Sequence, residues 1–210
     1  MRLRVKDPVS GLSHFTGFVL ALVGFAWLTL RGSSHPAMTA SVAAYGASLV
    51  ALYAASSAYH LIIAGERTTR VLRTFDHVAI FLLIAGTFTP VFWRAFEGTS
   101  RTVMLAGVWG VGVAGIALRV FWWRAPRALY TTLYVAMGWM VVPRWSAVAH
   151  AIPVAAAMLV VAGGVVYTLG AVVYALRWPN PFPRVFGFHE IWHIFVLGGS
   201  ALHFAAVASL

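Results

Sequence analysis

Two histidines near the end of the chain have the spacing of a helical metal site. The segment His189-Glu190-Ile191-Trp192-His193 separates two imidazoles by four residues, so on a helix they share one face and can bind one metal ion. The same letters spell the H-E-x-x-H pattern of zinc proteases, in which the glutamate is the general base. The chain has no cysteine, so a metal must bind imidazole, carboxylate or backbone oxygen. The pair therefore needs partners from elsewhere in the chain.

Long apolar segments must position these residues, because 61% of the 210 residues are hydrophobic and only 10% are charged. A helix needs about 20 apolar residues to cross the hydrocarbon layer. We predict an all-α membrane protein, with a single domain over residues 1–210 and seven transmembrane helices. The predicted spans cover residues 13–30, 37–63, 74–96, 103–121, 129–142, 152–176 and 188–210. The fifth is short, and Pro90 is expected to kink the third.

The positive charges predict the orientation of the chain in the membrane. The formal net charge is +10, but the basic residues lie in short gaps between apolar segments, without the stripe or stacking surface that nucleic acid requires. Four of the fifteen Lys and Arg residues lie on one side: Arg31, Arg94, Arg101 and Arg144. The other eleven lie on the side of the N-terminus: Arg2, Arg4, Lys6, Arg67, Arg70, Arg73, Arg119, Arg124, Arg127, Arg177 and Arg184. This excess predicts a cytoplasmic N-terminus and a C-terminus outside.

This topology brings further polar side chains to the depth of the histidine pair. The second helix ends toward the cytoplasm near His60, the third begins there near Asp76, and the seventh begins there with the histidine pair. At about 1.5 Å of rise per residue, all of them occupy one shallow layer of the bilayer. Three neutral imidazoles leave a fourth zinc position open for water, which Asp76 is placed to hold or deprotonate. Ser56 lies one turn before His60 on the same face, where it either serves the site or bonds a backbone carbonyl.

Other ionisable residues are assigned weaker roles. His77 should point about 100° away from Asp76, which makes it a supporting or interfacial residue. His203 lies about 20 Å further toward the outside than the histidine pair, so it lines a cavity at most. Glu190 lies about 60° from His193 around the helix, so geometry leaves it open as a base. The remaining histidines and acids are assigned to the interface or given no role in the site: His14, His35, His150, Asp7, Glu66 and Glu97.

Three segments between the second span and the C-terminus match a known pattern. They are Ser56-Ser57-Ala58-Tyr59-His60, then Asp76-His77-Val78-Ala79-Ile80 with Leu83-Ile84-Ala85-Gly86-Thr87-Phe88-Thr89-Pro90, and Phe186-Gly187-Phe188-His189-Glu190-Ile191-Trp192-His193 with Gly199-Ser200-Ala201-Leu202-His203-Phe204. With these segments the sequence resembles the hemolysin III family, the bacterial members of the progestin and adipoQ receptor (PAQR) group.

The resemblance implies seven helices with a cytoplasmic N-terminus in the bacterial inner membrane, and a zinc ion held by three histidines. Residue by residue, the ligands correspond to His60, His189 and His193. The residue that contacts the zinc-bound water corresponds to Asp76, and the group's serine corresponds to Ser56. Because Asp76 matches the water-contacting residue, Glu190 becomes a supporting or interfacial residue. Related membrane proteins include ceramide-cleaving amidases, and the bacterial members are linked to haemolysis and to the control of membrane fluidity.

Three hypotheses follow. The leading one is a zinc-dependent hydrolase that cleaves an amide or ester bond of a membrane lipid, with the lipid entering between the helices. The second is a sensor or regulator of membrane state, in which the zinc is structural. The third is a pore-forming haemolysin, against which the spans show no polar stripe wide enough for an aqueous pore. The first two need the same ligands, so the sequence does not separate them.

Overall fold

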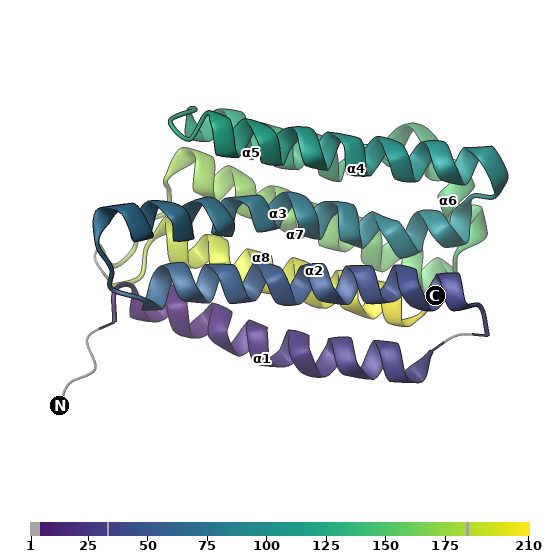
Figure 1. The fold of residues 1–210 in the computed structure, drawn as a ribbon, viewed down its shortest axis with the longest axis horizontal. Coiled ribbons are helices and arrows are strands. Elements are labelled where there is room, and N and C mark those ends of the chain that lie inside the picture. The colour runs from purple at the N-terminus through teal and green to yellow at the C-terminus, as the bar shows by residue number, and fades with distance from the viewer. Residues whose placement is uncertain (1–4, 33, 184) are drawn as a thin grey trace.

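The computed structural model describes residues 5–32, 34–183 and 185–210, and its regular structure there is helical (Figure 1). The elements are α1 (Pro8–Arg31), α2 (Pro36–Leu61), α3 (Glu66–Ala95), α4 (Gly98–Phe121), α5 (Arg127–Gly138), the short 3-10 helix η1 (Val142–Arg144), α6 (Trp145–Ala151), α7 (Val154–Leu176) and α8 (Phe188–Ala208). The predicted all-α class is confirmed. Of the charges used for the orientation, Arg2, Arg4 and Arg184 lie outside the described residues.

Proline determines where several helices start. Helix α1 begins at Pro8, α2 begins at Pro36, and Pro153 immediately precedes α7. A proline costs no hydrogen bond in the first helical turn, and its fixed φ angle suits that position. Pro90 lies inside α3, which continues through it as one helix. Helices α1, α3 and α4 begin at least five residues before their predicted spans, outside the most apolar part of each segment.

In the described residues six helices are long and apolar enough to cross a membrane, namely α1, α2, α3, α4, α7 and α8. The fifth predicted span, residues 129–142, differs from the structure. Helix α5 ends at Gly138, and the chain continues through a turn, η1 and α6. Glycine is a poor helix former, and Pro143 removes a backbone donor five residues later, so one helix does not extend across this segment.

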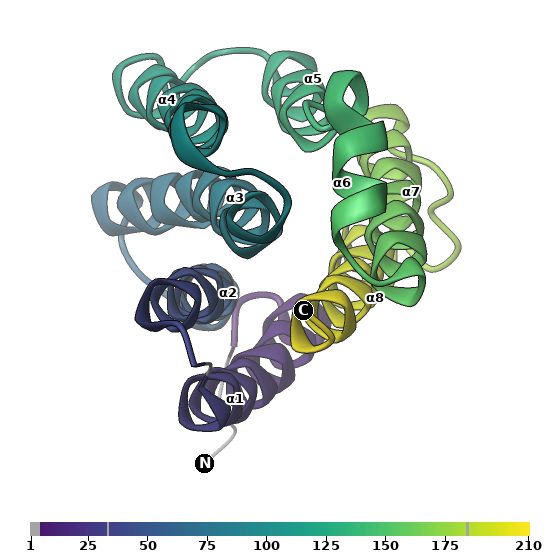
Figure 2. The same ribbon diagram turned by 90° about the vertical axis from the view of Figure 1, so that its right-hand side faces the viewer.

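The helices pack in chain order around two internal cavities. Figure 2 shows α1, α2, α3 and α4 side by side, with α8 lying between α7 and α1. One buried apolar cluster joins α1, α2, α3 and α8, and a second joins α3 to α4, α5, α6 and α7, so α3 belongs to both. The outer faces remain apolar, as Leu20 and Met158 show with more than 60% of their surface exposed. Such faces suit contact with lipid tails.

Helices α2 and α3 approach each other closely where Gly86 faces Ser48. A Cβ atom at Gly86 would lie 2.8 Å from the Cβ of Ser48 and 3.4 Å from the carbonyl oxygen of Ala44. Only glycine fits this contact without displacing the neighbouring helix. The close packing sets the position of the end of α2 relative to the start of α3, where the candidate site lies.

Candidate metal site

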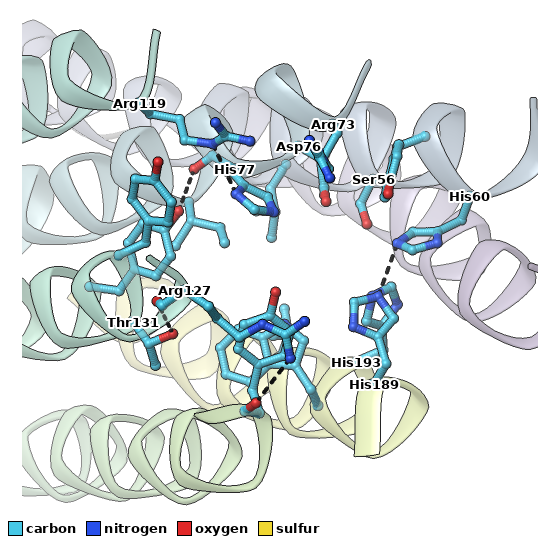
Figure 3. Close-up of a pocket in the computed structure, with 18 of the residues that line it drawn as sticks. Ser56, His60, Arg73, Asp76, His77, Arg119, Arg127, Thr131, His189 and His193 are labelled. Atoms are coloured by element: carbon cyan, nitrogen blue, oxygen red, sulfur yellow. Dashed lines mark hydrogen bonds between the residues drawn. The ribbon is translucent and has the colours of Figure 1, made fainter. Parts of the chain in front are cut away.

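Three histidines, of which His60 and His193 are buried and His189 is partly buried, meet at one end of the bundle. His60 lies in the last turn of α2, and His189 and His193 lie in the first two turns of α8. One ring nitrogen from each residue lies within 4.8 Å of the other two, and the Nε2 atoms of His60 and His189 are 3.3 Å apart. The four-residue spacing on α8 places both of its imidazoles on the face toward α2 (Figure 3).

The hydrogen bonds around these rings leave nitrogen atoms available for a metal ion. The Nδ1 of His60 lies 3.0 Å from Oδ2 of Asp7, and the Nδ1 of His193 lies 3.3 Å from the carbonyl oxygen of Ser10. Both partners accept hydrogen bonds, so each ring carries its proton on Nδ1 and keeps a lone pair on Nε2. Metal-binding histidines usually have this arrangement. The described residues therefore fit a metal ion.

Helix α1 contributes two side chains that the sequence assigned elsewhere. His14 is 3% exposed; its ring stacks on His193 with centroids 3.7 Å apart, and its Nδ1 lies 2.8 Å from the Ser56 hydroxyl. The prediction that His14 is interfacial is wrong, and so is the prediction that Asp7 has no part in the site. Both errors have one cause: α1 begins at Pro8, so its first turns lie inside the bundle. The sequence does contain a pattern that could have predicted this contact. Asp7, Ser10 and His14 are separated by three and four residues, a spacing that places their side chains on one helix face.

Asp76 and Ser56 line the same polar cavity as the histidines. The cavity has a volume of about 620 Å³. Asp76 lies in α3, one turn before the buried apolar stretch of that helix, and Ser56 lies one turn before His60 on α2. Figure 3 shows both side chains next to each other on the cavity wall. The neighbouring Ser57 instead donates to the carbonyl of Tyr53 at 2.6 Å and takes no part in the cavity.

The opposite part of this cavity is basic. Arg119, in the last turn of α4, is 2% exposed; its Nε donates to Nδ1 of His77 at 3.0 Å and its Nη1 to the carbonyl of Trp123 at 3.0 Å. Arg127, at the start of α5, donates to the carbonyl of Tyr174 at 3.5 Å. His77 is thus bonded to an arginine and lies apart from the three histidines (Figure 3). The sequence counted Arg119 as a loop charge, and its burial is a feature that sequence reasoning missed.

An apolar cavity of about 430 Å³ adjoins the polar one. The two share part of their walls: Leu52, Ile80, Tyr134, Trp192 and Val196. His203 lines the apolar cavity, where its Nε2–H donates to the carbonyl of Val160 at 3.1 Å. It lies outside the group of three histidines, as its depth in the sequence predicted. A polar cavity and an apolar cavity therefore lie next to each other along the bundle.

Glu190 stabilises the start of α8. Its Oε2 accepts a hydrogen bond from the backbone N–H of Gly187 at 2.8 Å, which is half of a capping box. Its Oε1 accepts a hydrogen bond from the Ser10 hydroxyl at 2.9 Å. With both oxygen atoms bonded in this way, Glu190 fixes the first turn of the helix that presents His189 and His193.

The bundle and its histidine cluster define a multi-pass helical membrane protein with a candidate metal site. The chain belongs to the haemolysin III family, because the family described as "Haemolysin-III related" matches residues 3–204. The chain is 32% identical over 207 residues to "Hemolysin-3" of Bacillus cereus, which covers 97% of this chain and 91% of that protein. It is 30% identical to the "Hemolysin-3 homolog" of Bacillus subtilis (strain 168), with 97% and 93% covered. A more distant relative is "Heptahelical transmembrane protein ADIPOR2" of Oryza sativa subsp. japonica, 30% identical over 174 residues, with 76% of each chain covered. The predicted family is confirmed.

Proposed function

We propose that the protein is a zinc-dependent hydrolase that cleaves an amide or ester bond of a membrane lipid. One observation supports this most strongly. Three imidazoles, each with one ring nitrogen within 4.8 Å of the other two, line a polar cavity, and this cavity adjoins an apolar cavity inside a membrane-embedded bundle. Cavities of this size with few convergent polar groups are typical of small-molecule sites.

Zinc is the metal that the donor set favours, because three imidazoles without thiolates are a common set for catalytic zinc. When bound, zinc polarises a carbonyl group and makes water a stronger acid. Asp76 accepts the proton of the attacking water and passes it to the leaving group. Ser56, whose hydroxyl lies 2.8 Å from Nδ1 of His14, donates its hydroxyl proton to the oxygen on which charge develops.

The two adjoining cavities match the two ends of a lipid. The polar cavity holds the bond to be cleaved beside the histidines, and the apolar cavity holds an acyl chain among aliphatic and aromatic side chains. Trp192 and Tyr134 belong to both walls and lie at the boundary between them. A membrane lipid is therefore both the substrate and the partner of this protein.

The proposal also covers the number of membrane crossings, the side on which the N-terminus lies, and the membrane in which the protein is located. Residues Arg127–Gly138, η1 and α6 together supply the fifth of seven crossings, which agrees with the word "heptahelical" in the name of the rice relative. The excess of Lys and Arg places the N-terminus and the histidine cluster on the cytoplasmic side. Because two of the similar proteins come from bacteria of the genus Bacillus, the proposed location is the bacterial cytoplasmic membrane, which this chain spans as a single domain.

Two measurements test the proposal. Metal analysis of the purified protein should find about one zinc per chain, and a chain without metal would contradict it. Lipid mass analysis after incubation in native-lipid vesicles should show products with the wild type, none with Asp76→Ala, and unchanged turnover with Glu66→Ala, which removes an exposed carboxylate from the same end of α3. Identical lipid profiles for the wild type and Asp76→Ala would instead favour a sensor of membrane state with structural zinc.

A further inference from the structure

The start of α1 contacts the histidine cluster with one face. This face is formed by Ser10 and His14 together with Asp7, the residue just before the helix, and is called the α1 face below. We propose that the α1 face is the supporting layer of the metal site, which holds the rings of His60 and His193 in the orientation and protonation state that metal binding needs. This inference rests on the proposed function, since it takes the three histidines as metal ligands.

The contact of Asp7 with His60 is the first part of this layer. The Asp7 carboxylate accepts the Nδ1–H of His60 at 3.0 Å, so the Nε2 of that ring is directed at His189, 3.3 Å away. A carboxylate behind a ligand histidine fixes the ring and makes its other nitrogen a stronger donor. His60 is 2% exposed, whereas the Asp7 side chain is 41% exposed, so the buried ligand is oriented by a residue at the surface of the bundle.

Ser10 forms the second part, because it contacts the start of α8 twice. Its carbonyl oxygen accepts the Nδ1–H of His193 at 3.3 Å, and its hydroxyl donates to Glu190 at 2.9 Å. Glu190 in turn caps the helix at Gly187. Ser10 is fully buried, so water does not replace these partners. One residue of α1 therefore fixes both a ligand ring and the helix turn from which that ring projects.

His14 completes the face one turn further along α1. Its ring lies flat against His193, with the planes inclined by 20°, and so limits rotation of that ligand. Its Nδ1 is bonded to Ser56, one turn before His60. The α1 face thus contacts α2 through Asp7 and His14, and α8 through Ser10 and His14. Two ligand-bearing helices are held by a third that supplies no ligand of its own.

Asp7 is the residue to test, because it lies outside the helix and is partly exposed, so its replacement should not prevent folding. We expect Asp7→Ala to weaken zinc binding 10- to 100-fold and Asp7→Asn to weaken it less, since asparagine keeps an acceptor without the charge. The matched control is Glu66→Gln, which removes an exposed carboxylate at the same end of the molecule and should bind zinc as the wild type does.

Zinc affinity is measured on the purified full chain in detergent, by competition with a chelator, and the visible spectrum of the cobalt-substituted protein reports the ligand geometry. Melting temperatures of the metal-free variants should equal that of the metal-free wild type, which separates a positioning role from a folding defect. Equal zinc affinity for Asp7→Ala and the wild type would overturn the inference but leave the metal site intact. A wild type that binds neither metal would refute both proposals, whereas zinc binding without lipid hydrolysis would refute the hydrolase alone.

Discussion

Replacing His193 with alanine removes one of three imidazoles whose nitrogen atoms lie within 4.8 Å of one another. Structural zinc sites with four ligands bind the metal with about 10–16 kcal/mol, or about 2.5–4 kcal/mol per ligand. The loss of one ligand should therefore raise the Kd for zinc by about 60- to 700-fold. The affinity is measured by chelator competition on the purified protein, with bound zinc counted after dialysis.

His203→Ala is the matched control for this experiment. It removes a second histidine from the same helix, but one that lines the apolar cavity and donates to the carbonyl of Val160. Its zinc affinity should equal that of the wild type. A His193→Ala protein that keeps wild-type affinity would refute the ligand assignment. Loss of binding in His203→Ala would show that the metal is held at a different depth in the bundle.

Three further predictions concern the base, the packing of the helices and the apolar cavity. Asp76→Asn should lower lipid hydrolysis by about 10²- to 10⁴-fold, measured as product release, while the zinc content stays at the wild-type level; a parallel loss of zinc would assign Asp76 to metal binding. Gly86→Val should destabilise the protein by about 1–3 kcal/mol, because the added atoms meet Ser48 across the contact between α2 and α3. The measurement is the melting temperature in detergent, which should fall; an unchanged melting temperature would show that the two helices separate at little cost. Gly164→Leu should slow the hydrolysis of long-chain lipids more than of short-chain ones, because a Cβ atom at this position would lie 3.9 Å from the Trp139 ring and has room to extend into the apolar cavity. Equal effects on both kinds of lipid would exclude this cavity as the acyl site.

The meeting of His60 with the α8 pair could be predicted from the sequence. Apolar length fixes where each helix enters the membrane, and alternation of direction places the end of α2 beside the starts of α3 and α8. Residues at matching depths are then close whenever their helices are neighbours. The structure adds the distances, including 3.3 Å between His60 and His189, which no hydropathy pattern contains.

The fifth crossing could not be predicted in the same way. Residues 129–142 are apolar, so they resemble a short span, but hydropathy does not distinguish a continuous helix from two helical pieces joined by a turn. The break depends on local chemistry at Gly138 and Pro143, and the next helical piece, α6, packs against α3 and α7 through tertiary contacts. Sequence periodicity contains no information about those contacts.

Arg119 and the α1 face were missed for a related reason. A charge at the end of an apolar segment can point to the lipid headgroups or into the bundle, and the two cases have the same sequence pattern. Arg119 points inward because His77 and the Trp123 carbonyl accept its hydrogen bonds. Asp7 and His14 point inward because α1 lies between α2 and α8. Only the packing of neighbouring helices decides such cases.

The depth of the cluster limits the kind of lipid bond that the proposed hydrolase can reach. In the proposed topology the three histidines, in the last turn of α2 and the first turns of α8, lie near the cytoplasmic ends of these helices, at the level where lipid headgroups join their acyl chains. The apolar cavity extends from there toward the middle of the bundle, as far as His203. Polar groups inside the membrane must be hydrogen-bonded to be tolerated, and here the α1 face supplies those bonds at one end of the bundle. A substrate aligned with its neighbours in the membrane would present the bond nearest its headgroup to the histidines, and bonds deeper in its chain would lie out of reach.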